Sequence, residues 1–390
     1  MKLDKSNWKK YRFDEFAQNI SQRVEPQTTD LTVYVGLEHL DPDSLHIKQH
    51  GSPSDVEGTK LKFFKGDIIF GKRRAYQRKA ALAECDGICS AHAMVLRAKA
   101  DIIDERLFPF FFHSRVFQIR AIDISVGGLS PTINWKDLAK QEFLLPSKEE
   151  QSRLAELLWG ADEVVERETV LLKSINSWKN IRMNYLLNAI GSDKSLWKKK
   201  KISDIGIVST SGVDKKVKSN EQEVNLINYM DVYNNFTKKI VRSMDFMKVT
   251  AKPTQIERNQ VYRGDVLFTP SSETKEDIGH SAVIYENLEN TLYSYHLVRL
   301  HFFETIDIDF KRYLFNNPII LKYFSKKAQG ITRMTLSLSD FNNTEILLPP
   351  IEIQQTISKE LSGVDIDIVK IEEQIKLSQQ LKSNLINQIF

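Results

Sequence analysis

Apolar residues recur at helical spacing in a long segment in the middle of the chain. Residues 146–190 contain one glycine, Gly160, and no proline after Pro146. Ser147 and Glu150 match a capping box, which marks a helix start. The apolar residues then follow the alternating three- and four-residue step of a heptad seam: Leu154, Leu158, Ala161, Val165, Leu172 and Ile175. The pattern predicts one helix of about 40 residues, roughly 60 Å long.

A second segment, residues 349–390, repeats this seam in the same register. The two Leu-Leu-Pro blocks before the seams lie 349 − 146 = 203 residues apart. The same offset converts Leu154, Leu158, Ala161, Val165 and Leu172 into Ile357, Leu361, Val364, Ile368 and Ile375, and Ile371 continues this second seam. One such helix alone would be read as an amphipathic helix that packs on its own domain. Two matched seams favour an antiparallel coiled coil between the helices.

The patterns of the segments before each helix predict short strands and turns, and the sequences of these two segments also repeat each other. Asp67–Phe70 and Ala93–Leu96 suit buried strands. Four short blocks return in the same order: Trp8-Lys9-Lys10 as Trp197-Lys198-Lys199, Lys65-Gly66-Asp67 as Arg263-Gly264-Asp265, Ser90-Ala91-His92 as Ser294-Tyr295-His296, and Leu144-Leu145-Pro146 as Leu347-Leu348-Pro349. An ordered set of this kind indicates a tandem duplication.

The expected fold class is therefore α+β. Two globular α/β domains, residues 1–145 and 193–348, are separated by two long helices, residues 146–192 and 349–390. The helices are expected to form an antiparallel coiled coil that relates the halves by a pseudo-twofold internal repeat.

Composition narrows the class of protein only slightly. A net charge of +4 is too small to identify a nucleic-acid binder by itself. Two cysteines, Cys85 and Cys89, argue against a disulfide-stapled secreted protein. The first residues lack the apolar region of a signal peptide, and no apolar run is long enough to span a bilayer. These features predict a cytoplasmic protein without membrane contact.

The layout and the repeated blocks resemble the specificity (S) subunits of type I restriction–modification enzymes. The resemblance is carried by residues 65–76, by residues 86–92 and by the two Leu-Leu-Pro blocks with their helices, and it covers nearly the whole chain. It implies that each globular segment is a target recognition domain for half of a bipartite, asymmetric site in double-stranded DNA. It also implies that the helices act as a spacer and dock modification (methyltransferase) subunits, expected to be two. Restriction or translocase subunits are further candidate partners.

The resemblance implies no catalysis by this chain, and the sequence offers no motif for it. An amino-methyltransferase motif is absent, since Asn316-Asn317-Pro318-Ile319 lacks the second proline and the aromatic residue. The sequence also contains no Gly-x-Gly cofactor loop and no GxxxxGK[ST] phosphate loop, so no cofactor is expected. A specificity factor of another phage-defence methylation system remains an alternative. So does a self-contained DNA methyltransferase or nuclease with unrecognised motifs.

The candidate DNA contacts lie in two kinds of loop. The densest basic cluster directly follows a predicted strand and consists of Lys72, Arg73, Arg74, Tyr76, Arg78 and Lys79. Arginine forks suit phosphates and the acceptor edge of guanine. The equivalent stretch of the second half is less basic and offers Lys275. Glycine-containing loops before each helix add Ser130, Thr332 and Arg333. A solvated charge run and an ordinary turn are the alternatives.

No metal site is expected. Cys85, Cys89 and His92 have a suggestive spacing, but structural zinc needs four ligands and the second half contains no cysteine. We interpret these three as buried structural residues, and the repeated Ser-x-His as part of the framework. The remaining predicted site residues are the helix seam of the spacer: Leu154, Leu158, Val165, Leu172, Ile357, Leu361, Ile368 and Ile375.

Overall fold

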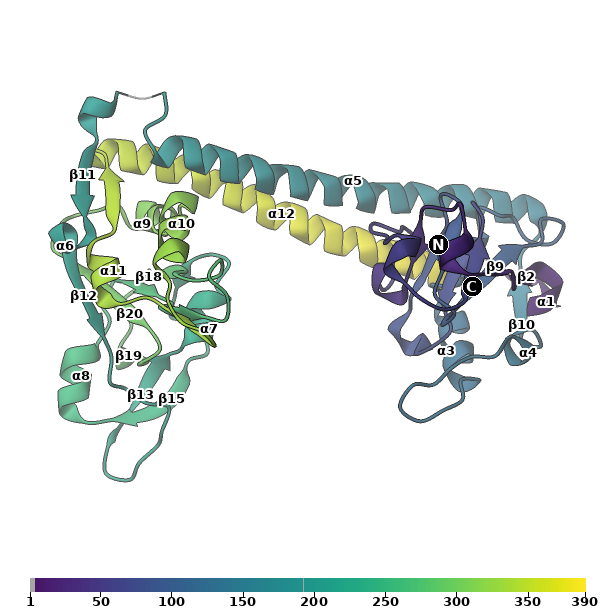
Figure 1. Ribbon diagram of the computed structural model, residues 1–390, viewed down its shortest axis with the longest axis horizontal. Helices are drawn as coiled ribbons and strands as arrows, with labels where there is room; N and C mark the ends of the chain where they lie inside the picture. The colour runs from purple at the N-terminus through teal and green to yellow at the C-terminus, as the bar shows by residue number, and fades with distance from the viewer. Residues whose placement is uncertain (1–3, 192) are drawn as a thin grey trace. The chain divides into compact units, whose positions relative to one another are not determined.

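The computed structural model describes residues 4–191 and 193–390 (Figure 1). The chain forms two compact units, Met1–Val170 with Glu372–Phe390, and Leu171–Ile371. Two long helices, α5 (Lys148–Leu187) and α12 (Ile351–Ile389), each contribute a segment to both units. Each unit therefore consists of a globular α/β part and of segments from two helices.

The first unit contains two four-stranded sheets with the strand orders β2-β9-β6-β7 and β3-β5-β8-β4. The strands are β1 (Lys9–Arg12), β2 (Ala17–Ile20), β3 (Arg23–Val24), β4 (Tyr34–Val35), β5 (Lys60–Phe63), β6 (Ile68–Gly71), β7 (Ala80–Leu82), β8 (Gly87–Cys89), β9 (Ala93–Ala98) and β10 (Glu142–Leu145). Its short helices are α1 (Phe13–Phe16), α2 (Phe108–Phe111), α3 (Arg115–Asp123) and α4 (Trp135–Leu138). The antiparallel pair β1–β10 joins the start of the globular part to the strand that leads into α5.

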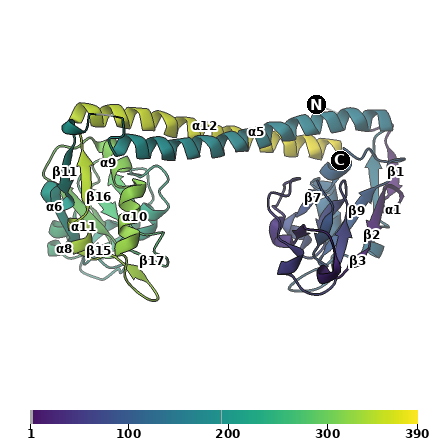
Figure 2. The same cartoon turned by 45° about the horizontal axis from the view of Figure 1, so that its top comes forward.

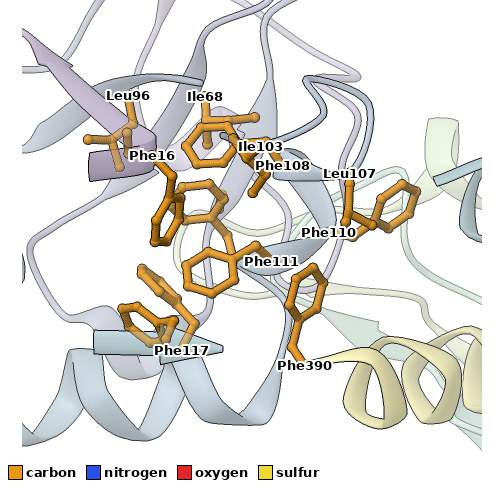
Figure 3. Packing of buried hydrophobic residues seen from close by; sticks show 14 of the residues in the cluster. Phe16, Ile68, Leu96, Ile103, Leu107, Phe108, Phe110, Phe111, Phe117 and Phe390 are labelled. Atoms are coloured by element: carbon orange, nitrogen blue, oxygen red, sulfur yellow. The ribbon is translucent and has the colours of Figure 1, made fainter. Parts of the chain in front are cut away.

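Phenylalanine dominates the core of the first unit (Figure 3). The run from Leu107 to Phe112, the longest apolar run noted in the sequence, is fully buried. The ring of Phe111 packs edge-on against Phe143 of β10 at 4.8 Å and against Phe390 at 5.3 Å. The last turn of α12 is therefore part of this core, which ties the helix to the globular part by burial of apolar surface.

The second unit repeats this plan with its strands divided differently between two main sheets. A five-stranded sheet has the order β12-β20-β16-β18-β14, a three-stranded sheet the order β15-β13-β19, and β11–β22 and β17–β21 are separate pairs. The strands are β11 (Lys198–Lys201), β12 (Gly206–Thr210), β13 (Gln222–Ile227), β14 (Lys239–Ile240), β15 (Met247–Ala251), β16 (Val266–Phe268), β17 (Ser271–Ser272), β18 (Ser281–Ile284), β19 (Thr291–Tyr293), β20 (Val298–Phe302), β21 (Met334–Thr335) and β22 (Glu345–Leu348). The helices are α6 (Ile202–Ile205), α7 (Tyr229–Tyr233), α8 (Pro253–Asn259), α9 (Ile308–Leu314), α10 (Pro318–Lys327) and α11 (Leu338–Asn342).

Within each unit, a segment of α5 lies against a segment of α12, and the two run antiparallel (Figure 1 and Figure 2). In the second unit, Lys179 Nζ lies 2.5 Å from Asp365 Oδ1, and Arg182 Nε lies 2.5 Å from Glu360 Oε1. Residue numbers thus rise along α5 as they fall along α12. The predicted fold class, with its antiparallel helices and internal repeat, is confirmed.

One ion pair between the helices obeys the pseudo-twofold repeat. In the first unit, Lys382 Nζ of α12 lies 2.9 Å from Asp162 Oδ1 of α5. The offset of 203 residues converts Asp162 into Asp365 and Lys179 into Lys382. Each unit therefore joins the same two helix positions by a carboxylate and an ammonium, with the roles of the helices exchanged.

The predicted seam residues lie in two kinds of environment, the cores of the units and the contact between the helices. Leu154 and Leu158 belong to the phenylalanine-rich core of the first unit, and Ile357 and Leu361 belong to the core of the second. The first turns of each long helix thus pack on their own globular part, as an ordinary amphipathic helix would. Farther along the helices, Val165 is buried, whereas Leu172, Ile368 and Ile375 are half-buried.

Among the described residues, none of the helices combines the length and the apolar character that a membrane span requires.

Candidate nucleic-acid interface

Two loops of the first unit pair with each other through their backbones. Residues 72–79 connect β6 to β7, and residues 124–134 connect α3 to α4. The amide of Arg74 donates to the carbonyl of Pro131 at 2.7 Å, and the amide of Ile133 donates to the carbonyl of Lys72 at 3.0 Å. The predicted basic cluster and the predicted glycine-containing loop therefore form one site, which is called the paired loops below.

The side chains of the basic cluster divide into two groups. Arg78 forms an ion pair with Asp43 at 2.8 Å, and Lys79 Nζ donates to the carbonyl of Leu37 at 2.6 Å. These two side chains attach the loop to the domain. In contrast, the side chain of Arg74 is exposed and its Nε donates to Ser130 Oγ at 3.2 Å, and Tyr76 is 52% exposed.

Unusual backbone angles determine the direction of the loop formed by residues 72–79. Arg74 and Arg78 both have left-handed conformations, with φ of 57° and 56°, and they flank a 3-10 turn at Ala75–Gln77. This region is sparsely populated by residues other than glycine and usually marks a tight turn or a functional constraint. The turn directs Tyr76 toward solvent and gives the arginines a defined backbone position.

His92 joins the paired loops, although the sequence pattern assigned it to the framework. Arg73 Nη1 lies 3.3 Å from His92 Nε2. The arginine can only donate, so His92 accepts at Nε2 and carries its proton on Nδ1. Burial, followed by the charges of Arg73, Lys72 and Lys60, lowers the pKa of His92. The histidine is therefore neutral at neutral pH, and it lies in a strongly positive environment.

The second unit contains the same paired loops. Ser271 of β17 pairs with Thr335 of β21, and the amide of Leu336 donates to the carbonyl of Pro270 at 2.8 Å. The hydrogen bond from Leu336 to Pro270 is the counterpart of the bond from Ile133 to Lys72. The predicted contacts Thr332, Arg333 and Lys275 are all exposed on these loops.

Glycine is required at the turn of the second loop pair. Gly330 has a φ of +145°, and a Cβ at this position would lie 1.9 Å from the carbonyl oxygen of Arg333. A side chain would collide with the backbone, so only glycine permits this close approach. The turn holds Ile331, Thr332 and Arg333 at its exposed tip.

Aromatic and acidic side chains replace the basic cluster in the second unit. Tyr229 and Tyr233 of α7 stack with their ring centroids 5.5 Å apart, and Tyr229 donates from its hydroxyl to the carbonyl of Ser271 at 2.8 Å. Asp277 accepts hydrogen bonds from Tyr233 and from His280 Nε2, the latter at 2.7 Å. The two loop pairs thus share a backbone plan and differ in chemistry.

Of the three residues interpreted as buried and structural, Cys85, Cys89 and His92, only Cys89 is buried. Cys89 is buried, and burial raises the pKa of its thiol to about 12, which makes it a poor nucleophile. However, Cys85 and His92 are exposed, so that part of the interpretation is wrong. Cys85 lies in the turn between β7 and β8, and His92 lies in the turn between β8 and β9, where both side chains reach solvent.

The repeated Ser-x-His block forms the same turn in both units. The amide of His92 donates to Ser90 Oγ at 3.2 Å, and the amide of His296 donates to Ser294 Oγ at 3.2 Å. The serine hydroxyl accepts from the backbone amide of the histidine in both units, which is the geometry of a local turn and supports the framework role. In residues 4–191 and 193–390, no group of three or more His, Cys, Asp or Glu side chains is arranged to hold a metal ion.

A tandem α/β fold with two antiparallel helices and one solvent-facing loop pair per unit defines a duplicated recognition scaffold. The family model described as "Type I restriction modification DNA specificity domain" matches residues 6–177 and again residues 194–382, and the chain belongs to this family.

Curated relatives match about one half of the chain. The type I restriction enzyme EcoDI specificity subunit of Escherichia coli is 28% identical over 170 residues, which are 42% of this chain and 37% of the relative. The HindI specificity subunit of Haemophilus influenzae is 23% identical over 177 residues, which are 44% of this chain and 38% of the relative. The chain thus aligns with less than half the length of these relatives.

Solved structures resemble the chain over its whole length. A chain from a study of complex assembly and conformational transition in the type I R-M system superposes with a TM-score of 0.67 and 16% identity, and the match covers 100% of this chain and 98% of the other. The S subunit of a type I restriction–modification system from M. genitalium gives a TM-score of 0.54 and 14% identity, with 100% and 98% coverage. At this identity the likeness establishes the fold.

Proposed function

We propose that this chain is the DNA-recognition subunit of a type I restriction–modification complex. Each globular part reads one half of a bipartite, asymmetric site in double-stranded DNA. Partner subunits carry out the methylation and any cleavage of the DNA. The observation that carries the proposal is the pair of loops found once in each unit. The backbone plan is the same in both, but the exposed side chains differ, as two different half-sites would require.

The exposed side chains have the chemistry for reading base edges. In the first unit, Arg73 and Arg74 can donate to the acceptor edge of guanine or to phosphates, and Tyr76 adds an aromatic surface. In the second unit, Arg333, Thr332 and Lys275 take the corresponding place. The tyrosine pair beside that loop favours a recognition chemistry based less on charge.

Exposed apolar residues on α5 suggest where a partner docks. In the second unit, four of them lie at helical spacing and are 38–71% exposed: Leu171, Trp178, Ile181 and Tyr185. Spacings of seven, three and four residues place them on one side of the helix. Such a stripe is typical of a protein–protein contact. We assign it to a modification subunit, and the tandem duplication favours two such subunits per chain, with a restriction or translocase subunit as a further partner.

Methylome sequencing of a host with and without the gene tests the proposed function. We expect one bipartite motif with methylated adenine to disappear when the gene is removed, because the modification subunits then have no recognition subunit to direct them. Complementation with the intact gene should restore the same motif. An unchanged methylome, in a host whose modification genes are expressed, would refute the proposal.

Exchange of the first globular part should alter only one half of the motif. We set the junction at Pro146, because β1 pairs with β10 directly before α5 begins at Lys148. Residues 1–145 are therefore exchanged as one block, and α5 and α12 are kept. We expect methylome sequencing to show one new half-site and one unchanged half-site.

The exchanged part must keep the contact with α12 for this test to be clear. The donor should have an aromatic residue at the position of Phe111, so that Phe390 retains its packing partner. The same exchange with a close relative that recognises the same half-site serves as the control and should leave the motif unchanged. A change in both half-sites would show that the two globular parts do not read DNA separately.

A further inference from the structure

A cavity beside the paired loops of the first unit has no role in the function proposed so far. It has a volume of about 380 Å³, within the range of roughly 300–1,000 Å³ typical of small-ligand sites. Residues from both four-stranded sheets line it, together with Lys72 of the basic cluster and the start of α4. The cavity is therefore built by the fold of the whole globular part rather than by one loop.

The walls of this cavity are positively charged. Arg23 of β3, Lys60 of β5 and Lys72 line it, and no aspartate or glutamate is among the described residues that do so. Burial, with a contribution from the charge of Arg23, lowers the pKa of Lys72. Three cations thus share one concave space without a carboxylate, and such a concave positive site attracts an anion.

Neutral groups complete the walls. The amides of Asn19 and Asn134 can donate hydrogen bonds to an anion, and Trp135 offers an aromatic surface. A lysine is a compact point charge that suits phosphate, whereas an arginine fork also suits the edge of guanine. Phosphate is the anion that best matches several cations, amide donors and a nearby flat apolar surface.

The position of Lys72 connects the cavity to the paired loops. Lys72 is adjacent to Arg73, whose guanidinium contacts His92 instead of lining the cavity. Successive side chains of an extended backbone point to opposite sides, so Lys72 and Arg73 can serve two different purposes. A DNA strand that crosses the paired loops would bring its backbone to the cavity.

We propose that this cavity binds a backbone phosphate of the DNA strand whose bases lie against Arg73 and Arg74, with Lys72 and Arg23 as its cationic ligands. Lys60, whose Nζ donates to the carbonyl of Gly58 at 2.8 Å, adds a further positive charge to the wall. This inference rests on the proposed function, and it adds a separate anchoring site that carries no sequence information. The contact with the phosphate positions the first unit on the duplex, while Arg73 and Arg74 read the bases.

Two residues that line this site, Lys72 and Trp135, have uncharged, non-aromatic counterparts in the described part of the second unit. The hydrogen bond from Leu336 to Pro270 makes Pro270 the counterpart of Lys72, and the repeat offset makes Leu338 the counterpart of Trp135. The first replacement removes a cationic ligand, and the second removes the aromatic wall of the cavity. The anchoring is therefore asymmetric, and the first unit contributes more of the salt-dependent affinity.

The test measures how DNA affinity depends on salt. The full chain, in complex with its modification subunits, is titrated with a duplex that contains the methylated motif and with a shuffled duplex of the same composition. We expect Lys72→Gln and Arg23→Gln each to reduce the slope of log K against log[salt], and the two together to reduce it by about 0.9, the value for one phosphate contact, because both cations share one phosphate. Affinity should fall by the same factor on both duplexes, because a phosphate contact carries no sequence information.

A matched variant controls for the loss of charge alone. Arg153→Gln removes an exposed arginine that pairs with Glu149 on α5, outside the cavity, and should leave the slope unchanged. Thermal unfolding of each variant establishes that it is folded. If Lys72→Gln weakened only the motif duplex and left the slope intact, Lys72 would read a base and the proposal would be overturned. An unchanged slope and unchanged affinity on both duplexes would also overturn it.

Two further measurements complete the test. One distinguishes a DNA phosphate from free phosphate, and the other separates failure of the phosphate site from failure of the proposed recognition function. Inorganic phosphate is added at constant ionic strength, and thermal unfolding is followed. If phosphate stabilised the wild type but not Lys72→Gln while the DNA slopes stayed equal, the occupant would be free phosphate and the proposal would be wrong. If the wild type bound both duplexes equally, the proposed recognition function would fail, whereas a reduced slope for Lys72→Gln would still support the phosphate site.

Discussion

Leu361→Asp is expected to abolish stable folding of the second unit. Leu361 is fully buried and belongs to the same core as Ile357 of α12, Met183 and Leu187 of α5, and residues of the globular part. Removing a buried leucine costs about 2–5 kcal/mol. The new carboxylate adds the cost of burying a charge without a partner. The combined loss is comparable with the total stability of a typical domain, about 5–15 kcal/mol.

Thermal unfolding and limited proteolysis measure this effect. Leu377→Asp is the matched control, since it makes the same change on the same helix at a side chain that is 58% exposed. The control should shift the unfolding midpoint little, because most surface substitutions stay within about 0.5 kcal/mol. Equal destabilisation by both variants would contradict the assignment of Leu361 to the helix seam and the core.

Large parts of the architecture could be predicted because they follow from repeated local patterns. The heptad spacing of Leu154, Leu158 and Val165 recurs at the same offset, so the sequence predicted both long helices and their pairing. Helices depend on contacts between residues three and four positions apart, which a sequence displays directly. The alternative to the coiled coil, a helix that packs on its own domain, describes the first turns of each long helix.

The polar contacts of the helices were not predicted, although their signal was present. Asp162 and Asp365, like Lys179 and Lys382, obey the repeat offset. A heptad seam is defined by its apolar residues alone, so the pattern did not reveal that Asp162 is buried and that Lys179, Asp365 and Lys382 are partly buried. A polar residue that recurs in register next to an apolar seam is a sign of an ion pair between helices.

The candidate site depends on contacts between residues far apart in sequence, and local sequence patterns do not predict such contacts. The cluster at Lys72 was visible as a charge run, but its pairing with Pro131 and Ile133 comes from the fold of the whole domain. The division of the cluster into attaching and exposed side chains follows from Asp43 and Leu37, which lie more than 30 positions earlier. The tyrosine pair at Tyr229 was missed because aromatic residues are more often read as core.

Lys382→Met is expected to destabilise the first unit by about 3 kcal/mol, because it breaks a buried ion pair and leaves its carboxylate behind. Asp162 is 2% exposed, and it lies 2.9 Å from Lys382 Nζ and 2.7 Å from His46 Nε2. Burial alone would raise the pKa of Asp162, but the hydrogen bond from His46 and the charge and hydrogen bond of Lys382 outweigh it, so the pKa is lowered. Without Lys382, only His46 remains to compensate the charge.

Chemical unfolding of a double-mutant cycle measures the coupling. Asp162→Leu combined with Lys382→Met replaces both charges by apolar groups and should cost less than Lys382→Met alone, since no unpaired charge is left. Lys370→Met breaks an exposed pair with Asp367 on the same helix and serves as the control, with an expected effect below about 1 kcal/mol. If the single and double variants were equally destabilised, the unpaired carboxylate would not be the cause.

The same cluster makes the stability of the first unit depend on pH through His46. The hydrogen bond to Asp162 is the main cause that raises the pKa of His46 above its ordinary value. A raised folded-state pKa contributes stability that is fully present below the unfolded pKa, about 6.5, and is lost as the pH rises through the folded value. We therefore expect the wild type to lose stability from near pH 6.5 upward, and His46→Gln to lose this dependence. A wild type and a His46→Gln variant with parallel pH profiles would show that the imidazole of His46 does not hold its proton for Asp162.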